Sequence, residues 1–368
     1  MPPVMLGLLR EILSAEAGPE LVDNVDRTRF PEGFEEPPRN DAPARLAELL
    51  THATGLGTLF DRLEEAADRE LLLRVLAYRV LGHRRVQLPL TLDRLNGLVE
   101  RAQALRTQER TAAVGIFDWQ ADDYDLSRLG YPIRLRGYVG GIVQTFDLEQ
   151  YRCTGSPEVA AQPGDVVIDG GGYWGETALY FAQLAGEAGR VVSFEFEPSN
   201  LEVLHHNLSL NPRLARRISV IPSALWDQAG QEVHVHPFGP GTSISAEGEA
   251  RASTDTIDAL VARGDVERVD FIKLDVEGAE LNALHGAEST LRRFRPRLAI
   301  AGYHKAEDLA VIPEYLAGLE LGYHFRLGHT TMHGEETVVF AVSDPGPSDP
   351  RGDERIGTSH ESAGVGAT

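Results

Sequence analysis

Acidic and histidine side chains follow several apolar, β-branched stretches in the second half of this sequence. Asp169 ends VVID, Glu195 follows VVSF, Asp275 follows FIKL, and His304 follows RLAIAGY. Carboxylates and imidazoles are the side chains that accept protons near neutral pH, and both bind cations. The pattern predicts a site for acid–base or metal-assisted chemistry where these stretches end.

Strand-like and helix-like segments alternate from residue 163 onward, which predicts how those side chains are positioned. Continuous apolar strands between helices indicate an α/β fold, a doubly wound, mainly parallel Rossmann-like sheet. The final pair of strands is too close for a helical crossover and must form an antiparallel hairpin. The expected strands are 165–170, 190–196, 217–225, 269–276, 297–303, 323–329 and 336–342, and the expected helices are 176–186, 198–210, 254–264, 279–294 and 306–321. In such a sheet, ligands bind at the carboxyl ends of the strands.

A glycine-rich loop follows the first of these strands and allows two interpretations. Gly170, Gly172 and Gly175 satisfy the spacing of a dinucleotide-binding fingerprint. Asp169, Gly171 and Gly175 satisfy the acidic-x-Gly-x-x-x-Gly spacing of a site for S-adenosylmethionine (SAM). The loop therefore predicts a cofactor that contains adenosine, either NAD or SAM.

Charge separates these two ligands. NAD presents a pyrophosphate, which needs backbone donors and no competing carboxylate. SAM carries a sulfonium and an ammonium group, which favour carboxylates. The expected strand ends carry Asp169, Glu195 or Glu197, Asp275 and Glu277. An acidic site of this kind favours SAM.

Further cofactor contacts are expected on the second and third strands. We favour Glu195 as the carboxylate that accepts both ribose hydroxyls. Ser223 and Ala224 are small enough for an adenine ring to lie against their backbone. Trp226 is either a stacking partner for the ring or an ordinary core residue.

Residues 163–342 resemble the FkbM family of SAM-dependent methyltransferases, which have the class I fold. The segments that carry the resemblance are VVIDGGGYWGETALYFA, VVSFEFEPSNLEVLHHN, STDTIDAL, VDFIKLDVEGAELNALHGA, RPRLAIAGYHKAEDL and HGEETVVFA. The resemblance implies that SAM donates a methyl group to an oxygen of a small natural product or sugar.

A hydroxyl is a poor nucleophile until its proton is removed, so a general base or a metal ion is expected. His304 is the first candidate for the base, because a neutral imidazole accepts a proton near neutral pH. Asp275 and the neighbouring Tyr303 are the other candidate catalytic residues.

A divalent metal such as Mg²⁺ is the less favoured alternative. His329 and His333 lie in the expected hairpin turn, which reaches the same edge of the sheet. Together with Asp275 and Glu277, they are candidates for binding a metal or the acceptor.

The chain divides into four regions that differ in residue composition and pattern. Residues 1–110 predict a helical N-terminal domain that shapes the acceptor pocket or joins subunits into a homo-oligomer. Residues 111–162 predict short strands and a hairpin, 163–343 the SAM-binding domain, and 344–368 a disordered tail.

Composition limits the partners. With 35 Lys and Arg against 56 Asp and Glu, the net charge of −21 disfavours nucleic acid. The sequence contains no run of 18 or more apolar residues, so no segment is expected to cross a membrane. A single cysteine, Cys153, is consistent with a reducing cytoplasm. The expected partner is a small-molecule acceptor. Two alternatives stay open: a noncatalytic SAM-fold binding or scaffold protein, and an NAD-dependent oxidoreductase.

Overall fold

The computed structural model describes residues 2–27, 29–30, 41–107, 121–155, 157–236, 243–244, 248 and 250–343. The segment 112–119, expected to contribute short strands, lies outside the described residues, and so does the tail 344–368, expected to be disordered.

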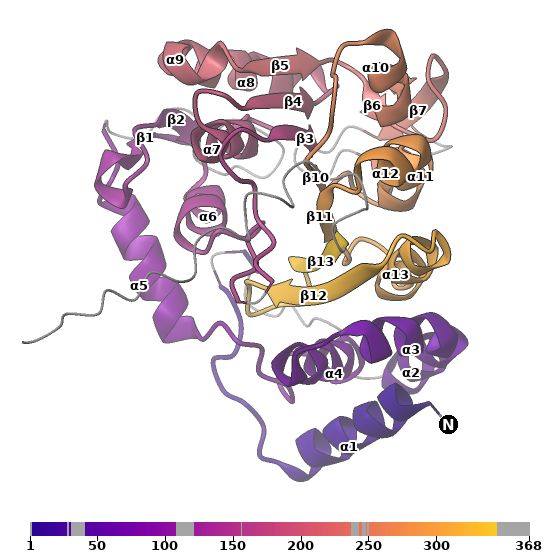
Figure 1. Ribbon diagram of the computed structural model, residues 1–368. Coiled ribbons are helices and arrows are strands. Elements are labelled where there is room, and N and C mark those ends of the chain that lie inside the picture. Colours follow the sequence, from indigo (N-terminus) through magenta and orange to yellow (C-terminus); the bar gives the residue numbers. More distant parts are fainter. Residues whose placement is uncertain are drawn as a thin grey trace, which may run out of the picture.

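A seven-stranded sheet forms the centre of the molecule, with the strand order β12-β13-β11-β10-β3-β4-β5 (Figure 1). The strands are β3 (Val166–Gly170), β4 (Arg190–Phe194), β5 (Ile218–Ile221), β10 (Phe271–Leu274), β11 (Arg297–Ala301), β12 (Tyr323–His329) and β13 (Thr337–Ser343). All neighbouring pairs from β11 to β5 are parallel, and β13 is antiparallel to both β11 and β12. The predicted C-terminal hairpin is therefore confirmed. Because β12 runs in the same direction as β11, its turn lies at the edge where the parallel strands end.

Successive residues of the strands point to opposite faces of the sheet and belong to two hydrophobic cores, one on each face. Val167 and Phe271 belong to one core, while Ile168 and Ile272 belong to the other. The first core contains residues of α7 (Glu176–Ala185), α8 (Pro198–Leu210) and α9 (Pro212–Ala215), and the second contains residues of α10 (Ile257–Arg263), α11 (Glu280–His285), α12 (Glu288–Phe294) and α13 (Asp308–Gly318). Helices thus cover both faces, which confirms the predicted doubly wound α/β fold.

The N-terminal helices add residues to both cores. They are α1 (Pro3–Ala17), α2 (Ala42–Thr51), α3 (Ala53–Arg62), α4 (Ala66–Leu81) and α5 (Leu92–Gln103). Helices α1–α4 form a layer below β12 and α13 in Figure 1 and share one hydrophobic core with the sheet. A buried ion pair of 2.6 Å between Asp68 of α4 and Arg326 of β12 joins this layer to the sheet. Helix α5 packs in the core on the other face of the sheet.

The lead-in segment is only partly a hairpin. Strands β1 (Asp122–Asp125) and β2 (Arg134–Gly137) pair antiparallel, as expected, around η2 (Leu126–Leu129). The prediction of further strand was wrong, because α6 (Val139–Ile142) and η3 (Val143–Asp147) are helical. Burial of Ile142, Val143 and Phe146 against α5 and α7 outweighs the β propensity of this segment.

A small second sheet stands beside the main one, in the order β6-β9-β7-β8. Its strands are β6 (Ala224–Leu225), β7 (Glu232–His236), β8 (Ser243–Ile244) and β9 (Ala250–Asp255). The strand expected at 217–225 is divided at Pro222, which has no N–H to donate. The helix expected at 279–294 is divided at Gly286, where a Cβ atom would meet the Trp226 carbonyl oxygen at 2.1 Å. None of the described helices combines the length and apolar character needed to cross a membrane.

Candidate active site

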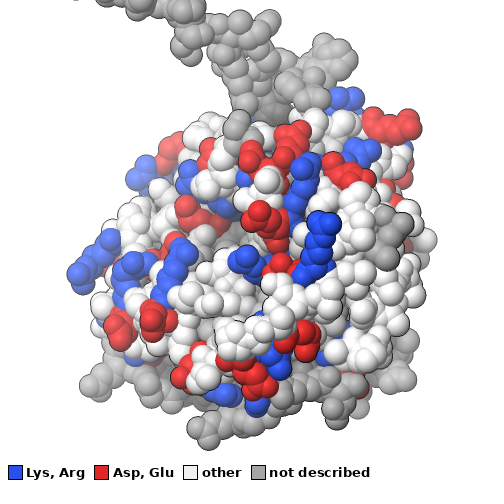
Figure 2. Space-filling view, turned by 90° about the horizontal axis from the view of Figure 1, so that it is seen from below, with Lys and Arg blue, Asp and Glu red and all other residues white. Residues whose placement is uncertain are grey.

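A cavity of about 1090 Å³ lies at the carboxyl ends of β3, β4 and β10, where the sequence predicts a ligand site. The turn between β12 and β13, helix α5 and the N-terminal segment also contribute to its wall. The lining carboxylates are Asp26, Glu176, Glu195, Asp275, Glu277, Glu335 and Glu336, whereas the lining lysine and arginine are Lys273 and Arg29. The described walls therefore carry an excess of acidic groups. On the described part of the face in Figure 2, by contrast, basic and acidic side chains are interspersed and form no continuous cationic surface.

The backbone N–H groups of the glycine loop bond within the chain. Gly171 and Gly172 both donate to the Phe194 carbonyl oxygen, at 3.1 and 2.8 Å, and Gly175 donates to Gly172 at 2.7 Å. Gly171 has a φ of +82°, and a Cβ atom there would lie 1.9 Å from the Asp275 carbonyl oxygen. The loop is therefore closed tightly onto β4 and β10, and these donors are not available to a phosphate.

Asp169 is placed beneath the loop, not in the cavity wall. Its fully buried carboxylate accepts hydrogen bonds from Thr177 Oγ1 at 3.0 Å and Ser193 Oγ at 2.8 Å. Gly170 and Gly175, also expected to contact the cofactor, likewise do not line the cavity, whereas Gly171 does. Asp169 therefore holds the loop in shape instead of pointing at a ligand.

Lys273 is a residue of this site to which the sequence interpretation assigned no role. Its buried ammonium group lies 3.4 Å from Asp169 Oδ1 and donates to the carbonyl oxygens of Gly170 and Gly171 at 2.9 and 2.6 Å. A lysine inside the apolar strand FIKL is the signal that could have revealed it, because a buried lysine needs a compensating partner.

Glu195 is the carboxylate of the second strand that enters the cavity. It is 7% exposed, and its Oε1 accepts hydrogen bonds from the N–H groups of Phe196 and Glu197 at 2.8 Å. Burial raises the pKa of Glu195 to about 7, against the lowering effect of those hydrogen bonds. Glu197 instead accepts from the Asn200 N–H and caps α8. Of the two candidate carboxylates, Glu195 therefore lines the cavity and Glu197 does not.

The cavity wall continues beyond Glu195 along residues that follow β4 and β5. Ser223 and Ala224 line it as expected, while Trp226 does not. Phe196 also lines it, although sequence reasoning did not single out this residue. Tyr173 lines the cavity beyond the glycine loop, with its ring stacked on Trp174 at 5.0 Å.

Two tyrosines hold Asp275 at the end of β10. Asp275 Oδ2 accepts from Tyr151 Oη at 2.5 Å, and Oδ1 accepts from Tyr303 Oη at 3.1 Å. Burial opposes ionisation of Asp275, but Lys273, His304 and the two hydroxyls outweigh it and lower its pKa. Burial and the charge of Asp275 raise the pKa values of Tyr151 and Tyr303 well above the ordinary value. Both phenols are therefore donors, and Tyr151 was not foreseen from the sequence.

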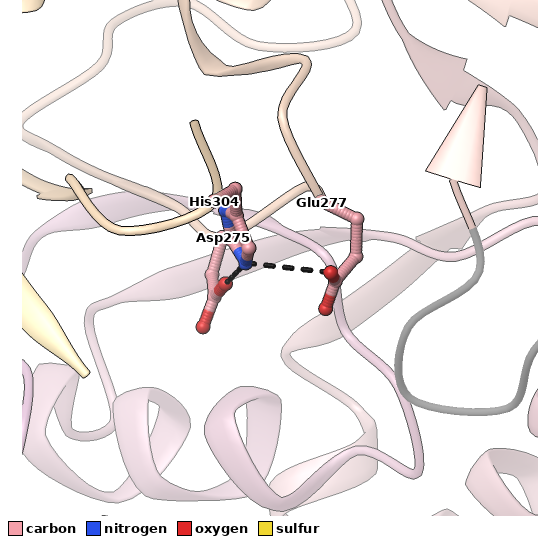
Figure 3. Close-up of side chains that lie close together, drawn as sticks. All are labelled: Asp275, Glu277 and His304. Carbon is pink, nitrogen blue, oxygen red and sulfur yellow. Dashed lines mark ion pairs between the residues drawn. The ribbon is translucent and has the colours of Figure 1, made fainter. Parts of the chain in front are cut away.

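His304 lies among three carboxylates. Its Nδ1 is 2.9 Å from Glu280 Oε1, and its Nε2 is 3.3 Å from Asp275 Oδ1 and 3.4 Å from Glu277 Oε2 (Figure 3). Burial disfavours the charged ring, but the Glu280 hydrogen bond and the three negative charges raise the pKa of His304 to about 10. This differs from the neutral base expected from the sequence, because the neighbouring carboxylates favour an additional positive charge at Nε2.

The two hairpin-turn histidines are not grouped with these carboxylates. His329 bonds Thr337 Oγ1 at 2.8 Å through Nδ1, and burial lowers its pKa to about 4. His333 lines the cavity, where its ring meets the edge of Phe30 at 5.1 Å, and burial lowers its pKa as well. Among the described residues, the groups whose ligand atoms lie close enough together to hold a metal ion are Asp275–Glu277–His304 and Glu280–His304–Asp308. The expected grouping of His329 and His333 with Asp275 and Glu277 is therefore not found there.

The N-terminal helices support the loop that carries His304. Arg79 of α4 donates to the carbonyl oxygens of Gly302 and Ala306, at 2.7 and 3.3 Å. Leu90 and Leu95 add apolar surface to the cavity from the segment around the start of α5. The helical region thus forms part of the site's wall.

Comparison with known proteins identifies this architecture. Residues 158–325 match the model of the methyltransferase FkbM domain. None of the curated proteins is a significant match to the sequence. Among solved structures, the methyltransferase FkbM from Methylobacillus flagellatus KT aligns with a TM-score of 0.51 and 19% identity, over 81% of this chain and 61% of that one. The chain thus spans about three fifths of that protein's length.

Two further solved structures align more weakly. A SAM-dependent O-methyltransferase from Thermotoga maritima has a TM-score of 0.33 and 14% identity, over 51% of this chain and 63% of that one. An O-methyltransferase from Bacillus cereus in complex with SAH has a TM-score of 0.34 and 15% identity, over 56% and 80%. The chain thus has a class I methyltransferase fold, and its residues 158–325 match the methyltransferase FkbM domain.

Proposed function

We propose that this protein is a SAM-dependent O-methyltransferase acting on a hydroxyl of a small natural product or sugar. The observation that carries the proposal is the acidic cavity at the carboxyl ends of the strands β3, β4 and β10, which belong to the segment that matches the FkbM domain. Carboxylates surrounding a hollow of this size suit a ligand with positive charge, as SAM has at its sulfonium and ammonium groups.

The residues present fit this cofactor. Glu195 offers a buried carboxylate for the two ribose hydroxyls, and the adjoining Phe196, Ser223 and Ala224 offer an apolar surface for the adenine ring. A side chain at Gly171 would collide with the Asp275 carbonyl oxygen, so glycine at this position lets the loop close against β10 at the cavity wall. Bound here, SAM supplies a methyl group that passes to the acceptor oxygen while the electron pair of the broken bond stays on sulfur.

The chain's own residues prepare the acceptor. Asp275 is fixed by Tyr151 and Tyr303, so its carboxylate is positioned before any ligand arrives. Together with Glu277 and His304 it forms the polar end of the cavity, where a hydroxyl can be oriented and its proton removed. Apolar groups such as Leu90 and Leu95 suit the hydrocarbon part of an acceptor.

The NAD-dependent alternative is less well supported. A pyrophosphate needs free N–H groups at the glycine loop, but Gly171 and Gly172 donate to Phe194. The surplus of carboxylates would also repel it. A noncatalytic SAM-binding protein has the same cavity and is separated only by measuring turnover.

Calorimetric titration with SAM, followed by methyl transfer to a panel of hydroxylated acceptors, tests the proposal. We expect one SAM per chain and transfer to oxygen. Asp275→Asn and His304→Ala should each cut turnover strongly while SAM affinity stays within a few-fold. Binding of SAM without transfer to any acceptor would favour the noncatalytic alternative, and tighter binding of NAD than of SAM would refute the proposal.

A further inference from the structure

The nitrogen Nε2 of His304 lies between two carboxylates without a hydrogen-bond partner among the described residues. The side chain is 9% exposed, so water does not readily replace the missing partner. Its neighbours are Asp275 Oδ1 at 3.3 Å and Glu277 Oε2 at 3.4 Å (Figure 3). Nε2 forms ion pairs with both carboxylates when the ring is protonated, but it has a hydrogen bond with neither, and a buried nitrogen in this position requires an explanation.

The spacing of these atoms fits ligands around a cation. Bonds of about 2.1 Å from a metal to nitrogen or oxygen place neighbouring ligand atoms about 3.0 Å apart in octahedral and about 3.4 Å apart in tetrahedral coordination. The two measured separations fall in this range, and the three ligand atoms all lie within 4.8 Å of one another.

A second carboxylate orients the imidazole from behind. Glu280 Oε1 lies 2.9 Å from His304 Nδ1 and also accepts a hydrogen bond from the Val276 N–H at 2.8 Å. Glu280 is 1% exposed, so this contact is shielded from water. Metal-binding histidines commonly donate their other ring N–H to a carboxylate in this way, which leaves the opposite nitrogen free to bind the ion.

The backbone conformation of Glu277 positions its carboxylate beside His304. Glu277 has a φ of +53°, in the left-handed region that costs free energy for any residue with a side chain. That conformation places its carboxylate beside His304 in the cavity wall, next to Asp275. Strain of this kind is typical of residues positioned for a ligand.

We propose that Asp275, Glu277 and His304 bind one divalent first-row metal ion, such as Mn²⁺ or Zn²⁺. Two carboxylates and one imidazole suit these ions better than Mg²⁺, which favours oxygen ligands alone. The ion replaces the proton on Nε2, and its remaining positions face the cavity. Its role rests on the proposed function: it coordinates the acceptor hydroxyl and lowers the pKa of that group, and the proton leaves to water. The site itself does not depend on that role.

Equilibrium dialysis against Mn²⁺ alone and against Zn²⁺ alone, read by elemental analysis, tests the site. Wild type should bind one ion per chain. Glu277→Gln and His304→Gln should each weaken binding about 10-fold or more, since each loses one of three ligands. Glu176→Gln is the matched control: it removes another cavity carboxylate and should leave metal affinity unchanged. Thermal melts of each variant verify that the chain stays folded.

Two results would overturn the inference. One is the absence of saturable binding of either ion by wild type. The other is equal loss in Glu176→Gln and Glu277→Gln, which would mean that the ion responds only to overall charge. A parallel titration with SAM in a chelating buffer separates the two proposals: SAM binding without metal binding leaves the proposed function standing, and metal binding without SAM binding leaves the metal site standing.

Discussion

Replacing Glu195 by Gln should weaken SAM binding by an amount set by one charge-assisted hydrogen bond. The carboxylate is 7% exposed and can accept from both ribose hydroxyls, whereas Gln offers one acceptor oxygen and one NH₂ donor. A hydrogen bond to a charged group contributes about 1.5–3 kcal/mol, so the loss should be about 2 kcal/mol, or about 30-fold in Kd. Calorimetry above the pKa of about 7 of Glu195 measures it.

SAH should show the same loss as SAM, because the two share the ribose. Glu197→Gln is the matched control, since Glu197 caps α8 and should change helix stability but not affinity. The ratio of the two dissociation constants, Glu195→Gln over wild type, should also fall as the pH drops below about 7, where the wild-type carboxyl becomes protonated. Equal affinities of wild type and Glu195→Gln, or an equal loss in Glu197→Gln, would refute the assignment of Glu195 to the ribose.

Further expectations concern stability. Burial raises the pKa values of Glu176 and Glu336 from 4.5 to about 7, so between those values the folded state binds more protons than the unfolded state and stability falls as pH rises. In urea titrations, the free energy of unfolding of Glu176→Gln should therefore increase relative to that of wild type between about pH 5 and about pH 8. If the difference between the two free energies is the same at both pH values, the prediction is contradicted. Asp68→Ala should cost about 3–5 kcal/mol in the same assay, because it leaves the Arg326 charge buried and unpaired; a loss below 1.4 kcal/mol, about tenfold in the unfolding equilibrium, would mean that the pair is dispensable. Gly171→Ala should lower the unfolding free energy as well as SAM affinity, because its φ of +82° and the adjacent carbonyl leave no room for a methyl group; a wild-type melting temperature would contradict this.

The alternation of strands and helices could be predicted because it depends on local patterns. Runs such as VVIDG and RLAIA are apolar on both faces, as strands in a covered parallel sheet must be. The failures came where tertiary contacts override local preference. The segment 139–147 is rich in β-branched residues, but it is helical because it packs between α5 and α7. The division at Gly286 depends on the close approach of Trp226, which sequence spacing does not reveal.

The position of the cavity was predictable from the sequence, but the contacts within it were not. Strand ends and acidic residues indicated the cavity edge and singled out Glu195, Asp275 and His304. Hydrogen-bond partners and protonation states depend on segments that are distant in the sequence. The sequence therefore predicted that Asp169 contacts the cofactor, whereas its carboxylate is bonded to Thr177 and Ser193 and paired with Lys273.

Other site features depend on contacts between segments far apart in the chain. Tyr151 reaches Asp275 across 124 positions of sequence, and Glu280 meets His304 across 24. No local pattern reveals such pairs.

A crystal structure of the protein with SAH would show directly where the cofactor binds. We expect SAH in the acidic cavity, with its ribose hydroxyls hydrogen-bonded to the Glu195 carboxylate and its sulfur facing Asp275 and His304. An adenosine group bound elsewhere, or a ribose that leaves Glu195 without contact, would contradict this expectation.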